Sequence, residues 1–210
     1  MHSKNSSPNL ENVPRRSFIE QARRQQIIEA TTTVLAEYGY VNTTFARISK
    51  HADISPSLIS YHFKDKEELT SEVLRVVSEA RTAHVQDKLA NVTGALAKLM
   101  TVLESDLANM GTHPQHFQAM VEVLFGARGV KGSMVYLGEN EDPAFSVIRD
   151  ILEEGKRSGE FGDIDAYNLA IIIDGARDTF LAQLAVRPAL DLEKFTKTLT
   201  AFAVQAVRKA

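Results

Sequence analysis

The side chains best suited to contacting another molecule lie on a short helix predicted over residues 56–62. At 100° per residue, Ser57 and Tyr61 share one face of this helix, with Leu58 and Ser60 on its flanks. In the major groove of DNA, serine and tyrosine hydroxyls can meet base edges or phosphates, and a leucine can touch a thymine methyl group. The same spacing also fits a plain helical hairpin in which Tyr61 packs on an earlier helix.

Residues 44–63 have the dimensions of a helix-turn-helix, with two short helices joined by a tight turn. Ile59 and Phe63 lie together on the face opposite Tyr61, where they should pack on the preceding helix. Ser55 is a plausible N-cap, with Pro56 at the first helical position, where proline loses no hydrogen bond. These features favour a hairpin with one polar outer face.

Phosphate contacts are expected at the ends of these helices, where hydroxyls, cations and unpaired backbone N–H groups gather. A basic arm before the first helix could reach the DNA backbone or the minor groove. The flanking candidates are Thr44, Ser55, His62, Lys64, Lys66, Arg15 and Arg16.

Charge is uneven along the 210 residues, whose formal net charge is −3. Residues 1–66 hold nine Lys/Arg against six acids, a net of +3, which leaves −6 on the remainder. This asymmetry indicates a basic N-terminal module on an acidic body. No cysteine is present, which excludes disulfides and thiolate chemistry. No signal-like or membrane-spanning segment is evident, so we expect a cytoplasmic protein.

Helical periodicity runs through the chain, and we expect an all-α protein of about nine helices. Gly39 should end the first long helix, while Asp65 and Glu68 form an acidic capping box that opens another. The predicted organisation is a disordered basic arm, a helix-turn-helix domain and a helical domain for ligand binding and dimerisation. Their respective ranges are 1–16, 17–64 and 65–210.

The run from Thr44 to Leu69, TFARISKHADISPSLISYHFKDKEEL, strongly resembles the DNA-binding region of the TetR family of bacterial repressors. The resemblance implies that the third helix contacts bases and that Lys66 lies near a phosphate. It also implies a homodimer on a pseudo-palindromic operator. Two positions depart from the family pattern, since Asp53 replaces a usual glycine and Ser60 a frequent tyrosine. The residues that face DNA by resemblance are Pro56, Ser57, Leu58, Ser60, Tyr61 and His62.

In the body, the helix predicted over residues 163–186 is apolar nearly all round, so other elements must cover several of its sides. By resemblance to the family, it pairs with the last helix across a two-fold axis. The expected dimer residues are Ile173, Phe180, Leu184, Phe195, Leu199, Phe202 and Ala206.

The resemblance also implies a pocket in the body for a small, largely apolar ligand that releases DNA. The expected lining, whose members could equally be ordinary core, is Leu103, Leu107, Met120, Leu124, Phe125, Tyr136, Phe145 and Ile148. Asp174, Arg177 and Asp178 are spaced to pair with one another, either at the dimer interface or as polar anchors of this pocket.

Other functions find little support in the sequence. His113 and His116 have a spacing that can bind metal, but no firm third ligand accompanies them, so we expect no metal. No catalytic or cofactor motif is evident, which argues against an enzyme. The alternatives kept are a ligand-independent DNA-binding regulator and an all-α adaptor that binds proteins.

Overall fold

The computed structural model describes residues 18–126, 143–187 and 189–209. These residues form nine α-helices and no strand, which confirms the predicted all-α fold. The helices are α1 (Phe18–Asn42), α2 (Phe45–Ala52), α3 (Pro56–His62), α4 (Lys66–Leu89), α5 (Ala95–Thr112), α6 (Pro114–Gly126), α8 (Pro143–Ser158), α9 (Ala166–Val186) and α10 (Leu192–Ala206).

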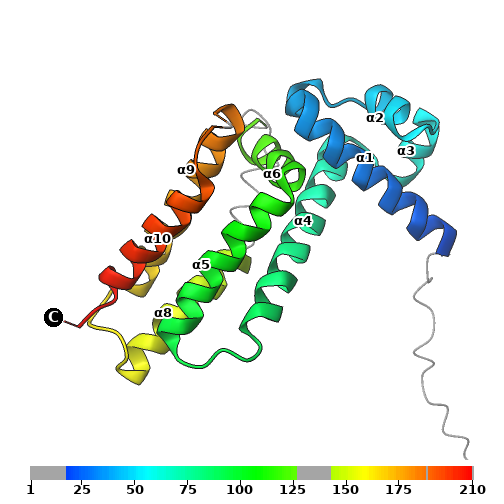
Figure 1. Ribbon diagram of the computed structural model, residues 1–210. Helices are drawn as coiled ribbons and strands as arrows, with labels where there is room; N and C mark the ends of the chain where they lie inside the picture. Colours follow the sequence, from blue (N-terminus) through cyan, green and yellow to red (C-terminus); the bar gives the residue numbers. More distant parts are fainter. Residues whose placement is uncertain (1–17, 127–142, 188, 210) are drawn as a thin grey trace, which may run out of the picture.

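Helices α1 to α3 form a small N-terminal unit, and α4 leads from this unit along the body (Figure 1). The helical geometry of α1 breaks at Gly39, whose φ of 77° suits a residue without Cβ, but another turn carries the helix to Asn42. The predicted end at Gly39 is therefore a break rather than the last residue. Asp65 caps α4 by accepting from the Glu68 N–H at 2.8 Å, while the Glu68 carboxylate accepts from the Lys64 N–H at 2.7 Å.

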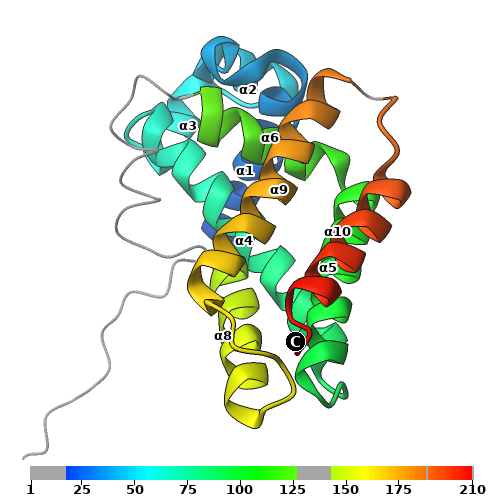
Figure 2. The same ribbon diagram turned by 90° about the vertical axis from the view of Figure 1, so that its left-hand side faces the viewer.

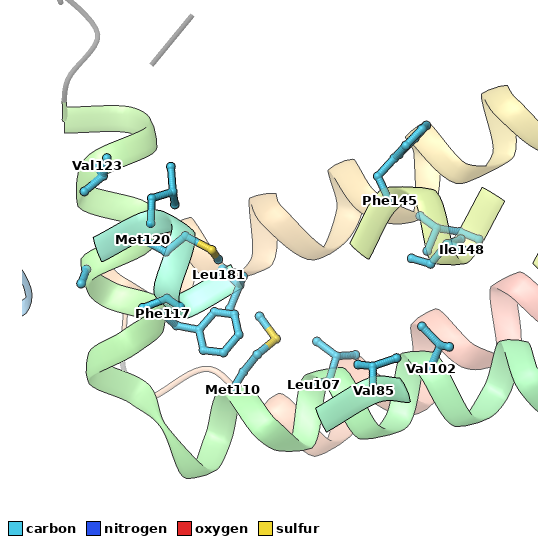
Figure 3. Packing of buried hydrophobic residues seen from close by; sticks show 14 of the residues in the cluster. Val85, Val102, Leu107, Met110, Phe117, Met120, Val123, Phe145, Ile148 and Leu181 are labelled. Carbon is cyan, nitrogen blue, oxygen red and sulfur yellow. The ribbon is translucent and has the colours of Figure 1, made fainter. Parts of the chain in front are cut away.

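The body packs α5, α6, α8, α9 and α10 around a continuous apolar core. Met110, Phe117, Met120 and Leu181 turn toward one another at one end of this core (Figure 3). The N-cap of α5 is a glycine, which has no side chain to cap the helix. Glu160, from the turn after α8, caps it instead. Its carboxylate accepts from the Ala95 and Leu96 N–H groups at 2.7 and 3.1 Å.

Helices α9 and α10 form one outer face of the body (Figure 2). Two of the expected dimer residues do not lie on it, because Ile173 is 0% and Leu199 4% exposed within a single protomer. Their assignment to the interface is wrong, since α9 and α10 each turn these side chains into the core. Exposed apolar groups on the same helices are Ile172, at 53%, and Phe202, at 46%.

The remaining dimer candidates are half-buried. The rings of Phe180 and Phe195 stack with centroids 3.9 Å apart and so join α9 to α10, whereas Leu184 and Ala206 each keep some exposed surface. This arrangement leaves a partly apolar surface along the two helices.

Candidate nucleic-acid interface

The helix-turn-helix is held by the caps that its sequence predicts. Thr44 Oγ1 accepts from the Arg47 N–H at 3.2 Å at the start of α2, and Ser55 Oγ accepts from the Leu58 N–H at 3.2 Å at the start of α3. Between them, Asp53 adopts φ 52° and ψ 49°, the left-handed conformation that aspartate tolerates better than most residues. The departure from glycine at this position therefore leaves the turn intact.

Helix α3 has one buried and one open face. Ile59 and Phe63 are 0% and 1% exposed, and they fasten the helix to the domain core. Tyr61 is 71% exposed, and Ser57 and Ser60 are exposed beside it. The open face thus presents three hydroxyl groups, as the periodicity predicted.

The other candidate residues of α3 differ in how exposed they are. Leu58 is half-buried rather than exposed, so its expected contact with a base methyl group involves only part of the side chain. Pro56 is exposed, and His62 is half-buried with its ring edge-on to Tyr61 at 5.0 Å between centroids. The Tyr61 hydroxyl donates to Glu20 Oε1 of α1 at 3.3 Å. Sequence reasoning missed Glu20, because no pattern relates residues 41 positions apart.

Arg24 of α1 fixes α3 against the start of α4. Its guanidinium lies 4.1 Å from the centroid of the Phe63 ring and 3.1 Å from Glu72 Oε1, and it donates to the His62 carbonyl at 3.4 Å. A face held at three points is well positioned to dock as a rigid body.

Lys66 joins the N-terminal unit to the body. Its ammonium donates to the Tyr40 carbonyl and lies 4.0 Å from the centroid of the Tyr40 ring, and burial lowers the pKa of Lys66 below its ordinary value. The Tyr40 N–H in turn donates to Glu122 Oε2 of α6 at 2.9 Å. By contrast, the side chain of Lys64 is 86% exposed. Arg15 and Arg16 lie outside the described residues.

A buried ionic network occupies the middle of the body. The Arg81 guanidinium of α4 grips the Asp106 carboxylate of α5, with Nη2 to Oδ2 at 2.6 Å. Arg177 of α9 lies 3.5 Å from the same carboxylate and pairs with Asp174 and Asp178 at 2.6 and 2.9 Å. The predicted pairing within α9 is therefore present, but Arg177 faces inward, because its side chain is only 3% exposed.

Sequence reasoning missed Arg81 and Asp106. One signal could have found them, namely a charged residue placed among apolar residues at helical spacing. Arg81 lies midway between Val77 and Val85, and Asp106 lies next to Leu107. Burial alone would raise the pKa of Asp106, but the Arg81 and Arg177 guanidiniums outweigh this effect and hold it below its ordinary value.

Most expected ligand-lining residues are core. Leu103, Leu107, Met120, Phe145 and Ile148 are all at most 8% exposed. Ile148 and Arg177 border an enclosed cavity of about 10 Å³, which has room for one water molecule at most. Leu124 is half-buried, while Tyr136 and the side chain of Phe125 lie outside the described residues.

The helix-turn-helix matches a known family of regulators. The family described as "Bacterial regulatory proteins, tetR family" matches residues 27–73, which include α2, α3 and most of α1. Over these residues the chain is similar to the TetR family.

Curated relatives are similar to about half of this chain. The HTH-type transcriptional regulator BetI of Cronobacter sakazakii is 26% identical over 106 residues, covering 50% of this chain and 52% of the relative. The chain thus matches about half the length of the curated relatives. A TetR-family regulator from Rhodococcus sp. has a TM-score of 0.79 at 20% identity, covering 89% of this chain and 98% of its own.

A second structural neighbour is FadR from Bacillus subtilis in complex with stearoyl-CoA. It has a TM-score of 0.75 at 20% identity, covering 88% of this chain and 99% of the neighbour. These likenesses show a shared fold over most of the chain. Within the described ranges, no helix is both long and apolar enough to cross a membrane.

Proposed function

We propose that this protein is a sequence-specific DNA-binding transcriptional regulator that acts as a homodimer. The observation that carries the proposal is the open face of α3, where Ser57, Ser60 and Tyr61 stand over a buried anchor of Ile59 and Phe63. In a symmetric dimer, two such helices would enter successive major grooves about 34–36 Å apart. Selection of bound fragments from random DNA by the purified protein should therefore return a pseudo-palindrome.

Replacing Tyr61 with alanine should lower discrimination between the selected operator and unrelated DNA by about tenfold, since one good base contact contributes about 1–3 kcal/mol. The side chain is largely exposed and outside the core, so the fold should persist. Fluorescence anisotropy with both DNAs measures the ratio of affinities. Operator preference equal to that of the wild type would show that the reading face has been assigned wrongly.

Lys66→Ala should weaken binding to all DNA sequences about equally and lower the slope of log affinity against log salt by about one. The contact with a phosphate requires the ammonium to turn from the Tyr40 carbonyl or to reach past it. Lys88→Ala is a matched control, because it removes an equal charge from an exposed position in the last turn of α4, away from α3. An unchanged salt slope in Lys66→Ala would show that Lys66 contacts no phosphate and serves only to contact Tyr40.

We further propose that a small, largely apolar ligand enters the body and releases DNA, which makes the protein a repressor. The acyl-CoA complex of the FadR neighbour and the many apolar side chains around α5, α6 and α8 support this idea. The ionic group around Arg177 would hold a polar end of the ligand, and the core would have to open around it. A thermal-shift screen of hydrophobic metabolites followed by operator release tests the proposal, and binders that all leave operator affinity unchanged would refute it.

A further inference from the structure

A cleft of about 500 Å³ lies where the DNA-binding unit meets the body. Its apolar wall includes Met110 of α5, Phe117 and Val121 of α6, and Leu181 and Leu184 of α9. Three of these side chains, Met110, Phe117 and Leu181, converge in Figure 3. The volume falls in the range typical of small-molecule sites, about 300–1,000 Å³. Among the described residues that the sequence predicts to line a ligand pocket, none borders this cleft.

Helix α1 closes another side of the cleft through Ala36 and Glu37. An occupant would therefore touch both the DNA-binding unit and the two body helices α6 and α9. Close by, α1 already contacts α6 through the hydrogen bond from the Tyr40 N–H to Glu122. A ligand in the cleft would add a second bridge across the same junction.

The polar groups of the cleft favour positive charge. Glu37 is the one ionisable residue among the described lining residues, and the amide oxygens of Gln115 and Gln118 can face a positive charge. His113 caps the C-terminus of α5, and His116 lies in the first turn of α6. Burial, followed by the proximity of His113, lowers the pKa of His116, so this ring does not bring an opposing charge near pH 7.

Three helices also contribute residues near their C-terminal ends to the lining of the cleft. Glu37 lies in the last turn of α1 before the break at Gly39, Gly111 in the last turn of α5, and Leu184 in the last turn of α9. Each such end carries roughly half a negative charge. The N-terminus of α6 at Pro114 borders the cleft as well and offsets one of these ends. The sum of these partial charges and the carboxylate charge of Glu37 is negative.

We propose that this cleft binds a small organic cation with an apolar body, such as an aromatic quaternary ammonium compound. The cationic head lies toward Glu37 and the helix ends, and the apolar part packs on Phe117, Leu181 and Leu184. A bound cation fixes α1 relative to the body. Its effect on DNA rests on the proposed function, but its binding to the protein does not.

Isothermal titration calorimetry of the full chain tests the site, with phenyltrimethylammonium as the probe and 4-tert-butylbenzoate as an anion of similar size. We expect the cation to bind at least tenfold more tightly than the anion. Glu37→Gln should weaken cation binding about fivefold, whereas Glu104→Gln, which removes an exposed carboxylate elsewhere on α5, should not. Ala36→Trp should abolish binding by filling the cleft, with an unchanged melting temperature as the check on folding.

Equal affinity for the two probes, or cation binding unaffected by both Glu37→Gln and Ala36→Trp, would overturn the proposal. No binding of the cation at millimolar concentration would do the same. A second measurement takes operator affinity at saturating cation. If the cation changes operator affinity in the wild type but not in Ala36→Trp, the bridge between α1 and the body is supported. If the cation leaves operator affinity unchanged in the wild type, the bridge is rejected. A protein that binds the cation but no DNA would refute the proposed function and leave the cleft site standing.

Discussion

Asp106→Asn should lower the free energy of unfolding by about 3–5 kcal/mol, which is the usual cost of removing one partner from a buried ion pair. The substitution keeps the shape of the side chain but leaves the guanidiniums of Arg81 and Arg177, each at most 3% exposed, without their shared carboxylate. Urea unfolding at one fixed protein concentration measures the change, since self-association would otherwise contribute to stability.

The matched control for Asp106→Asn is Glu154→Gln. Glu154 pairs with Lys98 at 2.7 Å on a surface where both side chains are partly exposed, at 43% and 26%. Such pairs contribute about 0–1 kcal/mol. If Asp106→Asn cost no more than this control, the network around Arg177 would be dispensable for stability.

The same substitution should alter the dependence of stability on pH. The folded pKa of Asp106 is depressed, so its stabilising contribution is present above the unfolded pKa, near 4, and is lost as pH falls through the folded value. The difference in stability between wild type and Asp106→Asn should therefore be constant near neutral pH and narrow below about pH 4.

Phe202→Glu should convert a dimer into monomers and abolish operator binding. Phe202 is 46% exposed on the outer face of α10. In a two-fold interface the substitution acts twice, placing a charge from each subunit in an apolar contact. Sedimentation velocity at micromolar concentration measures the assembly.

The exposed position of Phe202 also makes this test interpretable. A glutamate there leaves the protomer's own core intact, whereas a substitution at Leu199 would disrupt that core. A matched control is Val186→Glu, since Val186 is 73% exposed at the end of α9. A wild-type protein that sediments as a monomer would refute the proposed homodimer, and a dimeric Phe202→Glu would place its interface elsewhere.

The local architecture of the N-terminal unit follows from the sequence by itself. The caps at Thr44, Ser55 and Asp65 and the left-handed turn at Asp53 involve partners within four residues along the chain. Periodicity likewise predicts the buried and open faces of a short helix such as α3, because one strip of apolar residues distinguishes them.

Only the tertiary structure decides which side of α9 faces inward. This helix is apolar nearly all round, so its periodicity cannot distinguish Ile173, which is buried, from Ile172, which is 53% exposed. The same limit explains why the ionic group was predicted within α9 alone. Its main partners, Arg81 and Asp106, come from α4 and α5, and only the packing of three helices brings them together.

The contacts that tie the two domains together are also beyond the sequence. Lys66 meets the Tyr40 carbonyl 26 residues away, and the Tyr40 N–H meets Glu122 82 residues away. Hydrogen bonds between distant segments depend on the angle at which α1, α4 and α6 cross. That angle is set by how their side chains interlock, which no local pattern of residue types encodes.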